Sequence, residues 1–263
     1  MRIFDAHFHV VDPRFPLVAN QGFLPDPYTV SDYLAEARPL GITGGAVVSG
    51  SFQGFDQGYL LDALARLGPG FVGVTQLPEN APDADILNLH AAGVRAVRFN
   101  LRRGGSAGVE SLEAMARRVH EIAGWHVELY ADATALADLL PVLTALPKLS
   151  IDHLGLSEDG LPTLLRLVEA GARVKATGFA RISGDVAAIL RAVARVNPGA
   201  ILFGTDLPST RTRRFAPEDI TLIEAALGEA MRDAVFHGNA ATFYGIDEAL
   251  PGGEAAERAF SAG

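Results

Sequence analysis

Residues 149–178, LSIDHLGLSEDGLPTLLRLVEAGARVKATG, contain one strand–helix–strand unit. An apolar run at 149–153 ends in a histidine, a helical pattern follows, and a glycine precedes a second strand-like run at 173–178. A connection this long that carries a helix predicts parallel strands, because parallel strands need a crossover of a dozen or more residues. The unit therefore indicates an α/β fold.

The same alternation of strand and helix recurs along the whole chain. Helical patterns separate strand-like runs at 2–7, 44–49, 71–76, 95–100, 126–131, 149–153, 173–178 and 201–206. Eight such units predict a closed (β/α)8 TIM barrel. The main alternative is an open, doubly wound sheet, but neither a GxGxxG motif nor a P-loop follows the first run.

The repeat predicts a single barrel domain over residues 1–246, followed by a C-terminal tail at 247–263. The first strand–helix connection is long, apolar and rich in proline (VVDPRFPLVANQGFLPDPYTV, residues 10–30). Long connections of this kind commonly cover binding sites, so we expect it to fold over the barrel mouth as a lid.

The composition is that of a globular protein and not of a disordered one. The 263 residues are 49% hydrophobic and 20% charged, and they include no cysteine. The chain shows neither a leader-like start nor an apolar run long enough for a membrane helix, so we expect a cytoplasmic protein without membrane association. The net charge of −9 argues against nucleic-acid binding. The sequence is compatible with a homo-oligomer. Because the chain as a whole is acidic, an anionic substrate would need locally placed arginines.

Polar residues gather at the carboxyl ends of the expected strands, where barrel enzymes carry their chemistry. In strand order they are His7 and His9, Ser49 and Ser51, Arg98 and Asn100, Tyr130 and Asp132, Asp152 and His153, Lys175 and Thr177, and Asp206. The sequence therefore predicts an active site at this end of the barrel.

Four of these residues form the candidate catalytic set: His7, His9, His153 and Asp206. An H-x-H pair at a strand end can bind one metal ion or present two imidazoles to one substrate atom. Asp206 can accept a proton from water or bind a metal. The structural alternatives are a strand-capping histidine and an aspartate that caps the next segment. His126 opens its strand at the opposite end, so we expect a structural role.

Arginines form a second signal in an acidic chain. Arg98, Arg102 and Arg103 lie at or just after the fourth expected strand, and Arg181 follows the seventh. Guanidinium groups bind carboxylates bidentately, so several of them at one mouth predict an anionic substrate. Surface ion pairing is the prediction for three further arginines, Arg211, Arg213 and Arg214.

The motifs DAHFH, VRFNL, GWHVELY, IDHLG, KATGFAR and GTDLP, in this order, resemble the amidohydrolase-2 family of the amidohydrolase superfamily. Within that family the likeness is to the 2-pyrone-4,6-dicarboxylate lactonases and related lactone hydrolases. It extends from residue 3 to about residue 245. The resemblance implies a hydrolase on a (β/α)8 barrel.

The resemblance also implies residue roles. His7, His9, His153 and Asp206 would be catalytic, with Asp206 activating the hydrolytic water. The positions that match substrate contacts are Arg98, Tyr130, Arg181, Ser51 and one of Arg102 and Arg103. The chain departs from the family pattern at Phe23, at 155–157 and at 206–209, where polar or aromatic groups near the mouth are replaced.

The residues leave the role of a metal open. His7, His9, His153 and Asp206 could hold one divalent ion such as zinc. They could equally act without metal, the imidazoles polarising a lactone carbonyl and Asp206 serving as base. A binuclear site is not expected, because the fifth strand ends in Tyr130 and offers no bridging ligand. We predict a hydrolase of a carboxylate-bearing lactone; the alternative is a metal-dependent decarboxylase of a small aromatic or unsaturated acid.

Overall fold

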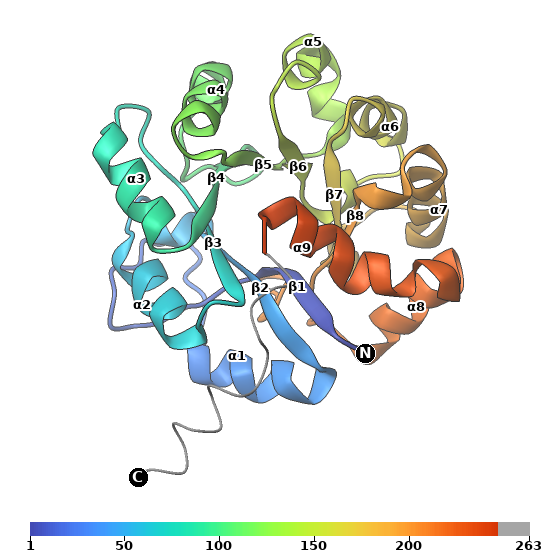
Figure 1. Ribbon diagram of the computed structural model, residues 1–263, viewed down its shortest axis with the longest axis horizontal. Coiled ribbons are helices and arrows are strands. Elements are labelled where there is room, and N and C mark those ends of the chain that lie inside the picture. Colours follow the sequence, from blue (N-terminus) through green and yellow to red (C-terminus); the bar gives the residue numbers. More distant parts are fainter. Residues whose placement is uncertain (247–263) are drawn as a thin grey trace.

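The structure is a computed structural model, and it describes residues 1–246; the tail predicted at 247–263 lies outside the described residues. Eight parallel strands follow one another around a barrel in chain order (Figure 1). The strands are β1 (Ile3–Phe8), β2 (Ile42–Val48), β3 (Phe71–Thr75), β4 (Val94–Asn100), β5 (His126–Tyr130), β6 (Leu149–Ile151), β7 (Arg173–Ala176) and β8 (Ile201–Phe203). The predicted TIM barrel is confirmed, with strand ends that shift by up to three residues.

Helices surround the barrel and lie between successive strands (Figure 1). They are α1 (Val30–Ala37), α2 (Gly58–Leu67), α3 (Asp83–Ala91), α4 (Leu112–Ala123), α5 (Leu140–Leu143), α6 (Leu161–Glu169), α7 (Val186–Val196), α8 (Pro217–Leu227) and α9 (Asn239–Tyr244). The helical pattern at 136–146 forms only one α-turn after a 3-10 segment, η4 (Ala133–Leu139). Pro141 at the start of α5 lacks the N–H that would continue the preceding helix.

Two apolar layers hold the barrel together. The larger layer lies between the strands and the surrounding helices. The smaller one fills the barrel interior at the amino ends of the strands, where Phe4 stacks on Tyr244 of α9 at 5.5 Å between ring centroids. Since α9 closes this end, the opposite, carboxyl end is left for the site.

The barrel closes at the seam between β1 and the segment that follows β8. The amide of Asp206 donates to the carbonyl of His7 at 2.8 Å, and the amide of His9 donates to the carbonyl of Leu207 at 2.7 Å. Beside them, the buried Asp5 accepts hydrogen bonds from both the amide and the hydroxyl of Thr205. These bonds fix the two chain segments that carry the predicted catalytic residues.

The long first connection lies against neighbouring loops at the carboxyl end. Its Val18 amide donates to the Phe52 carbonyl at 2.8 Å, and its Asn20 side chain donates to the Arg103 carbonyl at 3.2 Å. It thus forms one wall of the mouth, where the lid was expected.

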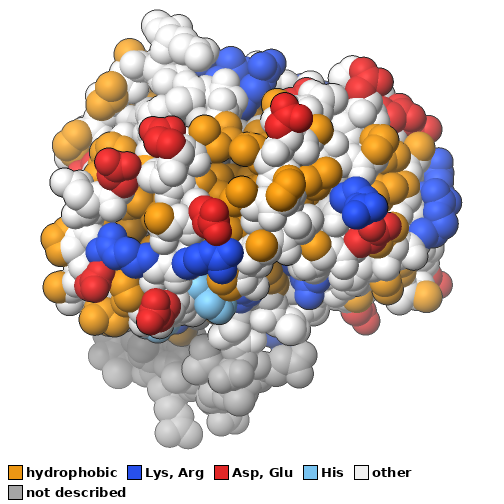
Figure 2. Space-filling model, turned by 90° about the horizontal axis from the view of Figure 1, so that it is seen from above, with side chains coloured by type: hydrophobic (Ala, Val, Ile, Leu, Met, Phe, Trp, Pro, Cys, Tyr) orange, Lys and Arg blue, Asp and Glu red, His pale blue; other side chains and the backbone are white. Residues whose placement is uncertain are grey.

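On the face shown in Figure 2, acidic and basic side chains are interspersed with apolar ones, without one continuous basic patch. Among residues 1–246, none of the helices has the length and apolar character that crossing a membrane requires.

Candidate active site

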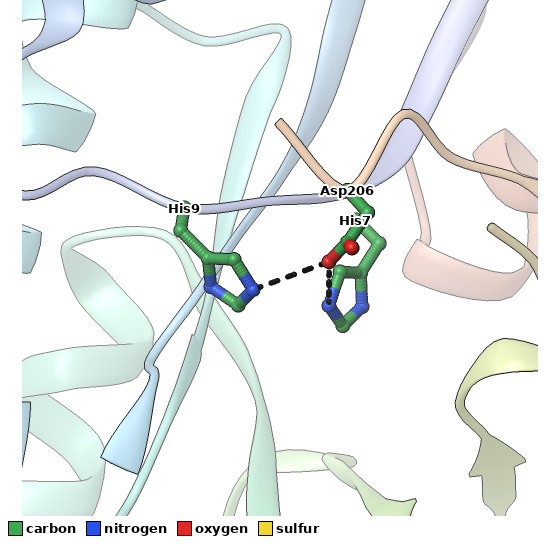
Figure 3. Close-up of side chains that lie close together, drawn as sticks. All are labelled: His7, His9 and Asp206. Carbon is green, nitrogen blue, oxygen red and sulfur yellow. Dashed lines mark ion pairs between the residues drawn. The ribbon is translucent and has the colours of Figure 1, made fainter. Parts of the chain in front are cut away.

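Two imidazoles and one carboxylate meet at the carboxyl end of the barrel. His7 Nε2 lies 3.8 Å and His9 Nε2 lies 3.6 Å from the same oxygen of Asp206, Oδ1 (Figure 3). All three side chains are buried. The structure thus brings together three of the four residues predicted to be catalytic.

An irregularity near the end of β1 aims His7 at this point. Asp5 accepts a hydrogen bond from Tyr33 of α1, so it faces the helix layer, whereas His7 faces Glu128 and Asp152 across the barrel. Residues two apart in a regular strand share a face. The register against β2 shifts between Asp5 and Phe8, and this shift turns His7 inward. Such bulges commonly re-aim side chains beside active sites.

His153, which follows β6, approaches His7 from the other side. The centroids of the two rings lie 4.9 Å apart. The donor atoms of His7, His9 and Asp206 lie within 4.8 Å of one another, but His153 belongs to a second group with His7 and Asp152. The compact group therefore contains three of the four predicted metal ligands, and His153 adjoins it through His7.

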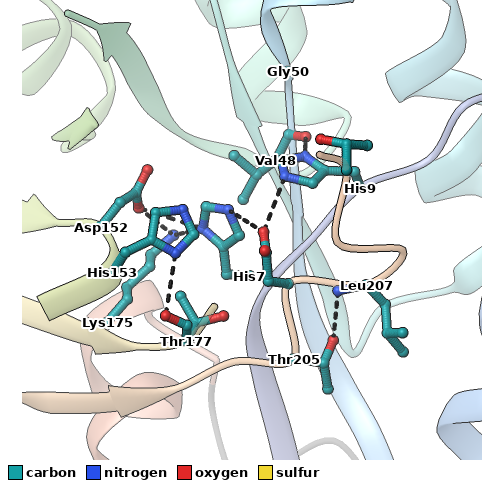
Figure 4. A network of polar contacts seen from close by, with 12 residues as sticks. His7, His9, Val48, Gly50, Asp152, His153, Lys175, Thr177, Thr205 and Leu207 are labelled. Carbon is teal, nitrogen blue, oxygen red and sulfur yellow. Dashed lines mark hydrogen bonds and ion pairs between the residues drawn. The ribbon is translucent and has the colours of Figure 1, made fainter. Parts of the chain in front are cut away.

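The tautomers of two histidines follow from their partners. His9 Nδ1 lies 2.7 Å from the Val48 carbonyl, and His153 Nδ1 lies 3.2 Å from the Thr177 carbonyl (Figure 4). A carbonyl oxygen can only accept, so each Nδ1 carries the proton. In the neutral rings each Nε2 is then a lone-pair donor to a metal. In metal sites, the ring nitrogen that does not bind the metal usually donates its N–H to a carbonyl or a carboxylate.

Burial favours the neutral forms of His7 and His153, and Arg181 keeps the Asp206 carboxylate charged. Burial lowers the pKa of His153 to about 4 and that of His7 well below its usual value. Burial alone would raise the pKa of Asp206, but the positive charge of Arg181 holds this pKa well below its usual value. Neutral imidazoles beside an ionised carboxylate are the donor set that a divalent cation prefers.

Two buried atoms at the centre of the group support the same fit. His7 Nε2 and Asp206 Oδ1 have no hydrogen-bond partner within the described part of the chain. Buried polar atoms without partners are costly. A cation between them, or a water molecule, would satisfy both.

The other oxygen of Asp206 is held by Arg181. The Arg181 Nε donates to Asp206 Oδ2 at 2.9 Å, and its Nη2 lies 2.9 Å from the same oxygen and donates to the Thr210 carbonyl. This ion pair fixes the carboxylate so that Oδ1 alone faces the histidines.

Arg98 is buried in β4 and forms an ion pair with the equally buried Asp152. Its Nη2 donates to Asp152 Oδ2 at 2.7 Å, and its Nη1 donates to the Ser49 carbonyl at 2.8 Å. The guanidinium also lies 5.2 Å from the centre of the Tyr130 ring. Most of the hydrogen-bonding groups of Arg98 are therefore used within the protein, although the side chain still lines the cavity.

A narrow cavity opens onto the cluster. Its volume is about 40 Å³, which is room for a few water molecules. The predicted site residues that line it are His9, Ser51, Arg98, Arg103, Tyr130, His153, Arg181 and Asp206. Arg102 lines an adjoining cavity of about 310 Å³, which shares Arg103 and Arg181 with the first. The arginines expected to bind an anion therefore do lie at one mouth.

Arg211 was predicted to form a surface ion pair, and this prediction is wrong. Its guanidinium lies 4.3 Å from the centre of the Phe23 ring, donates to the Asn20 carbonyl and lines both cavities. The left-handed backbone of Arg211 (φ 64°) turns it toward the mouth. Arg213 and Arg214 do form surface ion pairs, with Asp219 and Glu36.

Glu128 was not among the residues predicted for the site. This residue is fully buried in β5, where its carboxylate pairs with Lys175 of β7 and lies 3.6 Å from His7 Nδ1. The available signal was a charged residue in the middle of an otherwise apolar parallel strand, HVELY.

An eight-stranded barrel with an H-x-H pair at the end of its first strand and an aspartate after its last is typical of the amidohydrolase class. A sequence profile of the amidohydrolase family matches residues 4–246. The chain therefore belongs to the amidohydrolase-2 family.

Three characterised relatives are similar over most of their length. The chain is 29% identical to a 2-pyrone-4,6-dicarboxylate hydrolase of Comamonas testosteroni, over 84% of this chain and 81% of that protein. It is 29% identical to a D-galactarolactone isomerase of Agrobacterium fabrum (89% and 86%). It is 28% identical to a 4-sulfomuconolactone hydrolase of Rhizobium radiobacter (92% and 89%).

Solved structures share the fold. A protein from Agrobacterium tumefaciens superposes with a TM-score of 0.84 at 24% identity, over 94% of this chain and 97% of that one. A probable 2-pyrone-4,6-dicarboxylic acid hydrolase from Acinetobacter baumannii, with citric acid bound, gives 0.81 at 22% (93% and 100%). An amidohydrolase from Burkholderia multivorans with bound zinc gives 0.70 at 18% (94% and 100%).

Proposed function

We propose that this protein hydrolyses a lactone that bears at least one carboxylate, with Asp206 accepting the proton of the attacking water. The observation that carries the proposal is the position of Asp206 Oδ1. This oxygen is buried, without a hydrogen-bond partner in the described chain, beside His7 and His9 and at the base of a cavity lined by arginines. Two relatives named as hydrolases act on cyclic esters or pyrones, which supports the reaction class.

We propose that His7, His9 and Asp206 hold one divalent metal ion, such as zinc, with His153 beside it. The inward-facing Nε2 lone pair of His9, and that of His153, support metal binding over the metal-free alternative. A neutral imidazole without a proton on Nε2 cannot donate to a developing oxyanion. When bound, a divalent ion would act as a Lewis acid and acidify water.

The chain's own residues supply the remaining steps. Arg181 orients Asp206 through Oδ2, so Oδ1 faces the water and takes its proton. Asp206 then passes this proton to the oxygen of the opened ring, which restores the carboxylate. Among residues 1–246, neither Arg103 nor Arg211 forms an ion pair with a carboxylate. They would receive the substrate carboxylate together with Tyr130 and Ser51.

The test is a panel of mono- and dicarboxylate lactones assayed alongside a metal analysis of the purified protein. Asp206→Asn should lower kcat by about 10²–10⁴-fold, the usual contribution of a general base, while the protein stays folded. Asp185→Asn, at an exposed helix cap, is the control and should retain activity. Full lactonase activity in Asp206→Asn would refute the assigned role.

The same panel separates the decarboxylase. Carbon dioxide release from an aromatic or unsaturated acid, with no ring opening of any lactone, would replace the proposed function by that alternative. The neutral, inward-facing imidazoles fit the firm metal site that a decarboxylase of this superfamily would need, so the donor set alone does not separate the two reactions.

A further inference from the structure

Four ionisable side chains lie buried beneath His7, and the proposed chemistry leaves Glu128, Asp152 and Lys175 without a role. Arg98, Glu128, Asp152 and Lys175 come from β4, β5, the end of β6 and β7, and each is at most 3% exposed. Arg98 binds Asp152, and Lys175 binds Glu128 and lies 3.8 Å from Asp152. Burying four charges is costly even when they pair. The fold retains them next to one imidazole.

Both carboxylates point an oxygen at His7 Nδ1. Asp152 Oδ1 lies 3.3 Å and Glu128 Oε1 lies 3.6 Å from this nitrogen (Figure 4 shows His7, Asp152 and Lys175). Within residues 1–246, neither oxygen has a hydrogen-bond partner by strict geometry. The Lys175 ammonium also lies near, 3.4 Å from Nδ1.

The proton on His7 therefore has two competing arrangements. If Nδ1 carries it, both carboxylate oxygens face a donor. If Nδ1 is bare, it accepts from Lys175, but its lone pair then faces both oxygens. Their remaining contacts are longer ion pairs, 3.5 Å from Glu128 Oε1 to Arg98 Nε and 3.8 Å from Asp152 Oδ1 to Lys175 Nζ. The first arrangement is favoured, because it gives Asp152 Oδ1, the nearer oxygen, a hydrogen-bond donor and leaves Lys175 bonded to Glu128.

We propose that Asp152, supported by Glu128, is a positioning residue that holds His7 in the Nδ1–H form with its Nε2 lone pair directed at Asp206. Arg98 and Lys175 fix the two carboxylates. All three histidines then present Nε2 lone pairs, each with a protonated Nδ1. Part of the role of Arg98 is then to hold Asp152 in place, in addition to contacting substrate. The effect on catalysis rests on the proposed function, whereas the tautomer does not.

Nitrogen NMR on protein labelled with ¹⁵N-histidine measures the tautomer directly, in the chelator-treated and the zinc-loaded protein. The chain has seven histidines, and His7→Gln identifies the His7 signals. A pyrrole-type Nδ1 and a pyridine-type or metal-bound Nε2 are expected in the wild type. An Nε2–H tautomer in the wild type would overturn the proposal, and this measurement decides it even if Asp152→Asn does not fold.

Asp152→Asn tests the positioning step. Its amide can donate to Nδ1, so we expect a shift of His7 toward the Nε2–H form, and zinc affinity in a chelator competition should fall about 10–100-fold. In turnover, kcat should fall with little change in KM. Asp5→Asn is the matched control. Asp5 is equally buried, but it contacts Tyr33, Thr205 and the backbone amide of His7, not the His7 imidazole. The change should lower stability and leave the tautomer intact.

The outcomes separate the two proposals. Loss of the Nδ1–H form in Asp152→Asn but not in Asp5→Asn supports the positioning role, even if every lactone proves inert. An unchanged tautomer and zinc affinity in a folded Asp152→Asn would overturn it, even if the protein is an active lactonase.

Discussion

Gly178, after β7, lies against both His153 and Asp206, and its replacement by alanine should disable the site. Its backbone is left-handed (φ 59°), and an added Cβ would lie 2.6 Å from His153 Nδ1 and 3.0 Å from Asp206 Oδ2. Real Cβ atoms essentially never approach other atoms so closely. The imidazole or the backbone must therefore move.

The magnitude has two parts. A left-handed conformation costs a residue with a Cβ about 1–2 kcal/mol, so Gly178→Ala should lose about that much stability. To reach an ordinary contact of 3.4 Å, His153 must also move back by about 0.8 Å. Since a misplacement of about 1 Å can cost about 100-fold in rate, kcat should fall roughly 100-fold.

Gly124→Ala separates strain from displacement. Gly124 has a similar φ of 67°, ends α4 and has open space at its Cβ position. Chemical denaturation should give a stability loss for Gly178→Ala at least as large as that for Gly124→Ala, because the clash adds to the strain. Steady-state assays on the active lactone should show a loss of kcat only in Gly178→Ala. A Gly178→Ala enzyme whose kcat stays within about threefold of the control would refute this reasoning.

Two further changes test the mouth and the barrel base. Arg211→Met should raise KM for an anionic lactone about 10–100-fold, because that is the affinity a hydrogen bond to a charged group contributes, while kcat stays nearly unchanged. The control is Arg213→Met, at an exposed position. Equal KM values in the two variants would exclude Arg211 from substrate binding. His126 packs on Phe243 and Tyr244, and burial holds its folded-state pKa well below the unfolded value of 6.5. Its stabilising contribution is therefore complete above about pH 6.5 and is lost as the pH falls, by up to about 1.4 kcal/mol per pH unit. Urea denaturation should show a shallower acid loss in His126→Leu, and parallel profiles would contradict that pKa.

The relation between sequence and site is clearest for His7, His9 and Asp206. Strand periodicity and the helical crossovers predicted a parallel barrel, and all parallel strands point their carboxyl ends the same way. Residues at those ends had to share one rim, however far apart they lie in the chain. The sequence by itself therefore determined the fold class, the end of the barrel that carries the site and most of its members.

The tertiary structure alone decided how these residues pair. The shift in β1 turns His7 inward, although regular alternation would place it on the same face as Asp5. Arg98 and Asp152 are 54 residues apart, and only barrel closure sets their contact. Arg211 reached the mouth through a left-handed turn that its sequence does not signal. Local periodicity specifies which way a strand runs, whereas charge pairing across a barrel depends on distances that only the closed fold creates.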